Sequence, residues 1–97
     1  AQKVYSLLPA GEQGTVDSHL FLARLFYNQK QYTFAMTEAR KVQEIDKNNV
    51  HAINLKGMVF ARRDQLILAI REFEESLSIQ PDQPDIQQIV EVLKKSR

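Results

Sequence analysis

The side chains that could carry out catalysis or bind a metal are few and dispersed. His19 and His51 are the only two histidines, they are not four residues apart on one helix face, and the chain has no cysteine. A zinc site is therefore not expected. His19 is predicted to be a packed core or rim histidine. His51 lies near a predicted helix start, where it could touch a bound peptide.

Charged residues occur in short runs. Glu72, Glu74 and Glu75 form an acidic run on the fourth predicted helix, and Arg40 and Lys41 are its basic counterpart on the second. Solvated faces, or pairing between stacked helices, explain these runs more simply than acid–base catalysis. The sequence has no glycine-rich phosphate loop, nucleophile elbow or pair of catalytic carboxylates. We expect a protein that is not an enzyme and uses no cofactor or metal.

The composition is that of an ordinary globular domain. The chain has 97 residues, of which 43% are hydrophobic and 26% charged, with a formal net charge of +1. A disordered tail and a disulfide-stapled mini-protein are therefore excluded, and one domain is expected. The small net charge and the isolated pair Arg62–Arg63 do not predict nucleic-acid binding. The longest apolar run is Leu66–Ile70, too short to span a membrane, and no signal segment is visible. The localisation stays open.

Helical spacing of apolar residues dominates the sequence, with no strand-like alternation. Proline, glycine and asparagine-rich breaks divide the chain into segments with apolar residues three and four apart. The predicted helices are Val16–Asn28, Gln31–Ile45, Val50–Arg62, Gln65–Ile79 and Pro84–Ser96. A further short helix is predicted at Gln2–Leu8.

Start and stop signals agree with these segments. Thr15 is predicted to cap the first helix, and Asn48 or Asn49 the third. Lys30 and Asp64 occupy the tight turns inside two predicted hairpins. Pro84 suits the first turn of the last helix, where its missing N–H costs nothing.

The two predicted hairpins are an internal repeat. Residues 16–49 can be laid on residues 50–83 without a gap. The identical pairs in this alignment are Val16 and Val50, Phe26 and Phe60, Gln31 and Gln65, Ala35 and Ala69, Glu38 and Glu72, and Ile45 and Ile79. Size and polarity agree better than identity, as expected when packing is the shared constraint.

This pattern resembles the tetratricopeptide repeat (TPR) family, whose helix–turn–helix unit has a length of about 34 residues. The second unit carries its motif as Ile53, Lys56, Gly57, Phe60, Ala69, Phe73 and Pro81. The first unit carries it as His19, Leu22, Ala23, Phe26, Ala35, Ala39 and Lys47. Small residues are expected where helices approach closely, and Phe26 and Phe60 between neighbouring helices. Departures from the motif are Lys47 in place of proline, Ala39 in place of an aromatic residue, and Lys56 in place of leucine.

The resemblance implies an all-α fold, a right-handed superhelical stack of antiparallel helix hairpins (an α-solenoid). The expected division is an N-terminal segment 1–15 that resembles the end of a preceding repeat, units 16–49 and 50–83, and a capping helix or partial third unit 84–97. A pentatricopeptide-type RNA reader, with a longer repeat and a basic surface, and a plain four-helix bundle match the repeat less well. Because Glu91 and Lys94 stand where a partner helix would need small and aromatic residues, the last helix is predicted to be a polar cap.

Recognition of a protein partner is the function that the resemblance implies. In TPR proteins the first helix of each unit lines a concave groove that holds a peptide or helix of the partner. Carried over to this sequence, the groove residues are Asp17, Leu20, Arg24, Tyr27, Asn28, His51, Asn54, Met58, Arg62, Asp85 and Gln88. Arg24 is cationic but Asp85 has the wrong charge for the C-terminal carboxylate clamp of chaperone-binding TPR proteins, so that subclass is not expected.

Two other functions remain open from the sequence. The N-terminal residues Val4, Tyr5, Leu7 and Leu8 are apolar and could support self-assembly or contact with missing upstream repeats. A preceding repeat would make the chain a slice of a longer array. The chain could also be a regulatory fragment of a larger enzyme.

Overall fold

The computed structural model describes residues 15–96, and it is all-helical over that range, as predicted. The helices are α2 (Val16–Asn28), α3 (Tyr32–Ile45), α4 (Val50–Arg62), α5 (Leu66–Ile79) and α6 (Pro84–Lys95). The bounds of α2 and α4 are those predicted, whereas α3 and α5 begin one residue later and α6 ends one residue earlier. The helix predicted at Gln2–Leu8 and the apolar surface predicted around Val4 lie outside the described residues.

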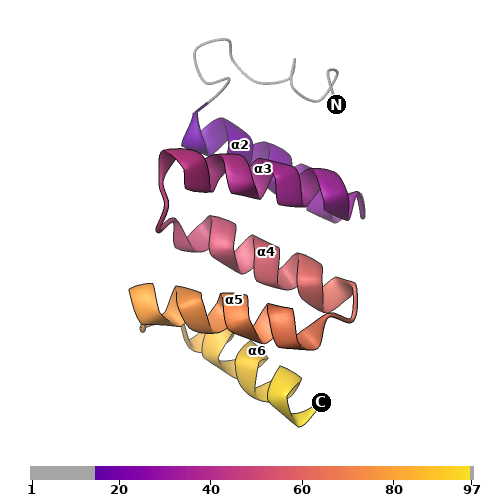
Figure 1. The fold of residues 1–97 in the computed structure, drawn as a ribbon, viewed down its shortest axis with the longest axis vertical. Helices are drawn as coiled ribbons and strands as arrows, with labels where there is room; N and C mark the ends of the chain where they lie inside the picture. Colours follow the sequence, from indigo (N-terminus) through magenta and orange to yellow (C-terminus); the bar gives the residue numbers. More distant parts are fainter. Residues whose placement is uncertain (1–14, 97) are drawn as a thin grey trace.

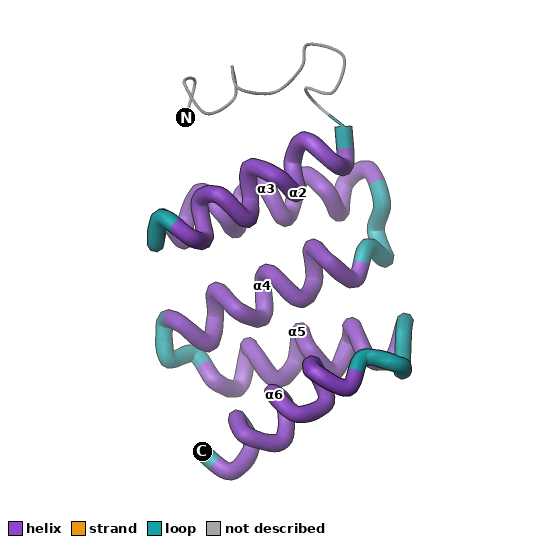
Figure 2. Tube along the Cα trace, turned by 180° about the vertical axis from the view of Figure 1, so that it is seen from behind, coloured by secondary structure: helices purple, strands orange, loops and turns teal. Residues whose placement is uncertain are grey.

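The helices pack in chain order along the long axis of the molecule (Figure 1). α2 packs with α3 and α4 with α5, while α4 also packs on α3 and α2, and α6 packs on α5. In both views α2, α4 and α6 run in one direction and α3 and α5 in the other (Figures 1 and 2). The three parallel helices therefore begin at one edge of the molecule and end at the opposite edge.

Side-chain caps fix where the helices begin. Thr15 and Ser18 form a capping box, in which Thr15 Oγ1 accepts a hydrogen bond from Ser18 N at 3.2 Å and Ser18 Oγ accepts one from Thr15 N at 2.9 Å. Asn49, and not Asn48, caps α4, because its Oδ1 accepts from Ala52 N at 3.1 Å. Pro84 occupies the first turn of α6 as predicted.

The turns at residues 29–31 and 63–65 have the same geometry. Lys30 and Asp64 have positive φ angles of 62° and 59°. Gln31 N donates to Phe26 O at 2.8 Å, and Gln65 N donates to Phe60 O at 2.9 Å. This is the Schellman arrangement that satisfies the last carbonyls of a helix. Its occurrence at the equivalent place of both hairpins shows that the internal repeat includes the backbone of the turns.

The buried apolar residues form two clusters. The first joins α2, α3 and α4, and its members are Leu20, Leu22, Ala23, Phe26, Ala35, Met36, Ala39, Val42, Ala52, Leu55 and Val59. The second joins α5 and α6, and its members are Ala69, Ile70, Phe73, Ile86 and Val90. Phe60 packs against both clusters, which agrees with the prediction that it fills space between neighbouring helices.

Gly57 of α4 lies directly against the ring of Phe73 of α5. A Cβ atom at Gly57 would lie 2.7 Å from Cε1 and 2.8 Å from Cζ of Phe73. Phe73 is fully buried, so its ring has no free direction in which to move. The prediction that this position must be small is confirmed, and the reason is one aromatic ring.

Buried charges pair between helices. His19 is buried, as predicted, with Nδ1 2.7 Å from Glu38 Oε1, and Lys41 Nζ lies 3.2 Å from Glu38 Oε2. Lys56 Nζ lies 3.2 Å from Glu72 Oε1 and donates to Gln43 at 2.9 Å, so its stem crosses the packed interior and its charge is paired.

Of the two explanations for the charged runs, pairing between α3 and α5 is contradicted, whereas the exposure of Arg40, Lys41, Glu74 and Glu75 agrees with solvated faces. The acidic run of α5 does not pair with the basic pair of α3. Glu72 pairs with Lys56 of α4, and Glu74 pairs with Lys94 of α6 at 2.9 Å. Lys94 is therefore not simply solvated. Glu38 and Glu72 are equivalent in the repeat, and each contacts the first helix of its own hairpin, α2 or α4. Neither therefore pairs with the second helix of the other hairpin.

Candidate functional site

A pocket lies across the three parallel helices, near the middle of the stack. It has a volume of about 340 Å³ and is called the central pocket below. Its lining residues are Arg24, Tyr27 and Asn28 of α2, His51, Asn54, Leu55 and Met58 of α4, and Asp85 and Ile86 of α6. All but Leu55 and Ile86 are among the predicted groove residues, and none belongs to α3 or α5. The structure thus brings much of the predicted set together in one place.

Asn54 is held in the central pocket by a buried glutamine. Asn54 Nδ2 donates to Gln83 Oε1 at 2.9 Å. Gln83 Nε2 in turn lies 3.0 Å from Ser76 Oγ, 3.3 Å from Ser76 O and 2.8 Å from Gln80 O. Because all three of these partners can accept, the nitrogen of Gln83 must face them. Its oxygen therefore faces Asn54, which fixes the orientation of the Asn54 amide.

The other polar atom of Asn54 has no partner. Asn54 Oδ1 is buried and makes no hydrogen bond. A buried acceptor without a donor costs free energy, so most such atoms are satisfied in folded proteins. Since this oxygen is buried, a ligand N–H could satisfy it only after the surrounding side chains move.

Arg62 and Tyr27 connect the two hairpins at the edge where α2 and α4 end. Arg62 Nε donates to Tyr27 Oη at 2.9 Å, and its Cζ lies 5.9 Å from the centre of the Tyr27 ring. The Tyr27 ring is itself 5.7 Å from the ring of Tyr32. The hydrogen bond to Tyr27, with smaller charge interactions from Tyr27 and Tyr32, raises the pKa of Arg62 above its ordinary value. The guanidinium is an exposed, oriented and permanently charged group.

Arg62 lines neither the central pocket nor the two hollows that adjoin it, whereas the other three predicted residues line those two hollows. Asp17 and Leu20 line one of about 400 Å³ on α2, together with Phe21, Arg24, Leu25 and Asn28. Gln88 lines one of about 420 Å³ on α6, together with Asp85, Ile89, Val92 and Leu93. Leu20 is only 8% exposed and belongs to the first apolar cluster, so it offers little area to a ligand.

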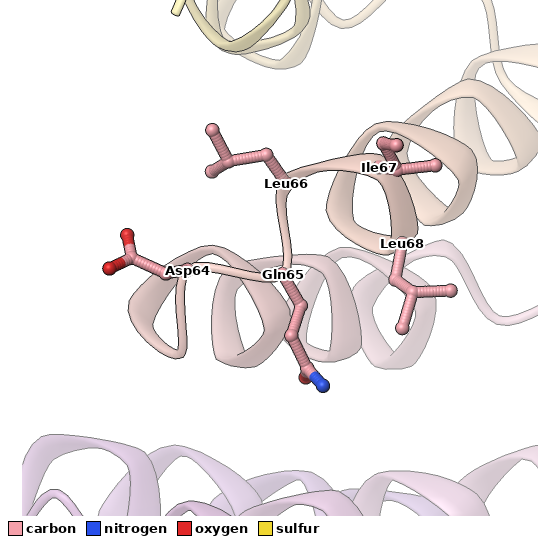
Figure 3. A pocket seen from close by; sticks show the side chains of 5 residues that line it. All are labelled: Asp64, Gln65, Leu66, Ile67 and Leu68. Atoms are coloured by element: carbon pink, nitrogen blue, oxygen red, sulfur yellow. The ribbon is translucent and has the colours of Figure 1, made fainter. Parts of the chain in front are cut away.

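A further hollow of about 370 Å³ lies at the turn between α4 and α5 (Figure 3). It is lined by the consecutive residues Asp64, Gln65, Leu66, Ile67 and Leu68. Their side chains spread apart and do not converge on one point (Figure 3). A hollow built from one short segment, without convergent polar groups, has little of what a specific ligand requires.

Gln83 is the residue of the site that sequence reasoning missed. It stands between Pro81 and Pro84 and resembles part of a simple connection. Its side chain contacts carbonyls at the end of α5, where unpaired backbone acceptors are expected, and its oxygen then reaches α4. A polar side chain between two prolines at a helix end was the available signal.

Residues 15–96 offer neither a metal site nor a membrane span. That range contains no group of three or more His, Cys, Asp or Glu residues that could hold a metal ion. No helix in the same range is long and apolar enough to cross a bilayer. Comparison with known proteins gives no matching family model and no matching curated protein. The TPR resemblance therefore stays a prediction from the sequence pattern.

Proposed function

We propose that the chain is a non-catalytic protein-interaction module of the tetratricopeptide type. In this proposal the helix pairs form a right-handed superhelical stack, and α2, α4 and α6 line its concave side. A peptide or helix of a partner protein lies across these three helices. The observation that carries the proposal is the central pocket, which draws residues from all three of them and from neither α3 nor α5.

The chemistry of the central pocket suits recognition of a peptide. It combines exposed hydrogen-bonding side chains such as Asn28 and His51 with apolar area from the half-buried Met58. The exposed side chains, and not the buried oxygen of Asn54, supply the polar groups that a peptide backbone can reach. Polar groups around a small apolar floor give orientation and contact area together.

Affinity capture from the native extract, quantified by mass spectrometry, tests the proposal. The groove variant is Arg24→Ala/Asn28→Ala/His51→Ala, because these three side chains are exposed and make no hydrogen bond or ion pair within residues 15–96. Tyr27 and Asn54 are left intact because both have internal hydrogen bonds. The matched control is Arg40→Ala/Arg71→Ala/Glu75→Ala, three exposed residues of α3 and α5.

The expected result is a partner that wild type and the control variant retain and the groove variant loses. All three proteins should have the same melting temperature, since surface substitutions of this kind change stability little. Partners that all three retain equally would refute binding at the central pocket.

Self-assembly is a second candidate, and one observation favours it. Leu55 and Val59 of α4 are buried in the first apolar cluster. The equivalent residues of the first hairpin, Phe21 and Leu25 of α2, line an open hollow, and Phe21 is 43% exposed. Phe21 and Leu25 thus form a partly exposed apolar surface on α2. The equivalent surface on α4, formed by Leu55 and Val59, is buried inside the molecule.

Light scattering over a range of protein concentrations tests self-assembly. If the α2 surface mediates it, the mass should rise with concentration for wild type and stay monomeric for Phe21→Glu. Ile67→Glu, at a more exposed position on α5, is the control and should behave as wild type. A wild-type chain that stays monomeric at high concentration would exclude this candidate.

A further inference from the structure

Arg62 is the best-oriented cation beside the central pocket. Its Nε is occupied by Tyr27 Oη, and Tyr27 is a lining residue of the pocket. The terminal nitrogens Nη1 and Nη2 make no hydrogen bond or ion pair with any residue in the described range. The planar guanidinium therefore presents two parallel donors from a position that its neighbour has already fixed.

At the ends of the three parallel helices, acidic and basic side chains lie at opposite edges, whereas Arg24 lines the same pocket as Asp85. Asp17 and Asp85 occupy the first turns of α2 and α6, at the edge where these helices begin. Arg62 stands in the last turn of α4, at the opposite edge, and Arg24 lines the central pocket. The ion pairs of residues 15–96 use His19, Lys41, Lys56 and Lys94, so the carboxylates of that range leave both arginines unpaired.

We infer that the central pocket binds an acidic segment of the partner, one of whose side-chain carboxylates accepts hydrogen bonds from Nη1 and Nη2 of Arg62. This inference rests on the proposed function and adds the chemical class of the ligand. An arginine fork and a carboxylate match in geometry, and such charge-assisted pairs are stronger than neutral hydrogen bonds. Tyr27 is a positioning residue, because it holds the fork without contacting the carboxylate.

A side-chain carboxylate fits better than the C-terminal carboxylate of a peptide. Lining residues continue along the stack on both sides of α4, with Asn28 on α2 and Asp85 on α6. A chain that lies across all three helices passes Arg62 and does not end there. Asp85 would repel a second acidic group at the α6 side, which limits the acidic position to the edge where α2 and α4 end.

A purely structural role for Arg62 explains only part of this arrangement. A cation in the last turn of a helix and carboxylates in first turns interact favourably with helix dipoles. That account covers the signs of Arg62, Asp17 and Asp85. It gives no reason for a tyrosine of a different hairpin to hold the guanidinium with its Nη atoms exposed. The two roles differ in what happens to binding selectivity when Arg62 is replaced.

Binding to defined peptide pools separates these roles. The probes are pools of short random peptides that are acetylated at the N-terminus and amidated at the C-terminus. In each pool one position is fixed as Glu, Gln, Lys or Leu, and the other positions are random. A parallel set with free C-terminal carboxylates tests whether the chain end matters. Affinities are measured by fluorescence polarisation with wild type, Arg62→Gln, Arg62→Lys, Tyr27→Phe and the control Arg71→Gln, an exposed arginine of α5.

The expected result is that a Glu-fixed pool binds wild type at least about tenfold more tightly than the Gln-fixed pool of the same position. This preference should vanish in Arg62→Gln and persist in Arg71→Gln. It should fall in Arg62→Lys, which keeps the charge and loses the fork, and in Tyr27→Phe, which loses only the acceptor that orients it. Added salt should reduce the preference without abolishing binding of the neutral pools.

Three outcomes would overturn the inference, and they are distinguishable. If peptides bind and Asn28→Ala/His51→Ala weakens them, but Glu-fixed and Gln-fixed pools bind alike, the acidic ligand is wrong and the peptide-binding function stands. If no pool binds, both the acidic-ligand inference and the proposed peptide-binding function are wrong. A preference that appears only with free C-terminal carboxylates would show that the chain end, and not an acidic side chain, is the ligand of Arg62.

Discussion

At the scale of single residues, the two hairpins solve the same packing problem with different pairs of side chains. In the second hairpin Gly57 receives the ring of Phe73, whose nearest atoms would lie within 3.0 Å of an added Cβ. The equivalent positions of the first hairpin are Ala23 and Ala39, both fully buried. In the second hairpin the side-chain volume at this contact comes from Phe73 alone. In the first hairpin Ala23 and Ala39 each supply a small part of it.

Gly57→Leu is the most direct test of this packing. Leucine favours a helix more than glycine does, yet its side chain has no space against Phe73. We expect a loss of about 1–3 kcal/mol in the free energy of unfolding, measured by urea denaturation. Arg71→Leu adds the same side chain on an exposed helix face and should change stability by less than about 0.5 kcal/mol. Equal effects of the two substitutions would contradict the close approach of α4 and α5.

The equivalence of the two pairs predicts a rescue. Ala39→Phe alone should destabilise the first hairpin, because Ala23 already occupies the space that glycine leaves open in the second. Combined with Ala23→Gly, the phenylalanine should be better tolerated, with a favourable coupling of about 1 kcal/mol in a double-mutant cycle. Urea denaturation of the four proteins gives the coupling. Strictly additive effects would mean that residues 23 and 39 do not meet as residues 57 and 73 do.

At the scale of the helices, one asparagine of a consecutive pair carries the cap of α4. Asn49 Oδ1 accepts from Ala52 N, whereas Asn48 is exposed and makes no hydrogen bond through its side chain. Asn49→Ala should reduce the free energy of unfolding by about 1 kcal/mol, and Asn48→Ala by much less. Thermal denaturation of the two variants side by side is a sufficient measurement. A larger effect at Asn48 would place the start of α4 one residue earlier.

The Schellman turns make a prediction of the opposite sign. Lys30 and Asp64 are non-glycine residues at positive φ. This backbone conformation is unfavourable for any residue that has a Cβ atom. Lys30→Gly should therefore stabilise the chain by about 0.5 kcal/mol despite the greater freedom of glycine when unfolded. Asp64→Gly should gain less, since aspartate tolerates this conformation better than lysine. Destabilisation by Lys30→Gly in thermal denaturation would show that the lysine side chain has a role of its own.

The helices could be predicted closely because their signals are local. Proline, caps and apolar spacing lie within a few residues of each boundary, so α2 and α4 were predicted to the residue. Gln31 and Gln65 were predicted as first helical residues, but each follows a positive-φ residue and serves as the N-cap with ψ near 70°. The partners of buried charges, such as Glu72 with Lys56, depend on rotation about helix axes, which apolar spacing alone defines only roughly.

The candidate site was less predictable for the same reason. The repeat indicated which residues share a face, and the central pocket gathers most of them. It could not indicate that Gln83 would reach back to Asn54, since that contact joins residues far apart in the chain and depends on how two helix ends meet. Nor could it show that Arg62 is held by Tyr27 of the other hairpin. Long-range polar contacts need the packed structure.

At the scale of the whole molecule, the described chain has two apolar clusters that meet between α4 and α5. One cluster spans α2, α3 and α4, and the other spans α5 and α6. In a stack where each unit contacts only its neighbours, cooperative unfolding depends on the interfaces between units. Phe60 packs against both clusters and is therefore the residue whose removal should most weaken their coupling.

Phe60→Ala should separate the unfolding of the two halves. The chain has no tryptophan, and all three tyrosines precede residue 33, so tyrosine fluorescence reports mainly the first hairpin. Circular dichroism reports all helices. In wild type we expect both probes to give one urea transition, as in a two-state domain. In Phe60→Ala stability should fall by about 2–4 kcal/mol, and the dichroism transition should begin before the fluorescence transition, because the cluster of α5 and α6 is the smaller one.

Phe34→Ala is the control for this last prediction. Phe34 is 52% exposed and its ring lies 5.4 Å from that of Phe26, within the first hairpin only. Removing it should lower stability while both transitions stay coincident, since it does not join the clusters. Coincident transitions in Phe60→Ala would mean that contacts other than Phe60, such as the pairing of Lys56 with Glu72 between α4 and α5, suffice to make the stack unfold as one unit.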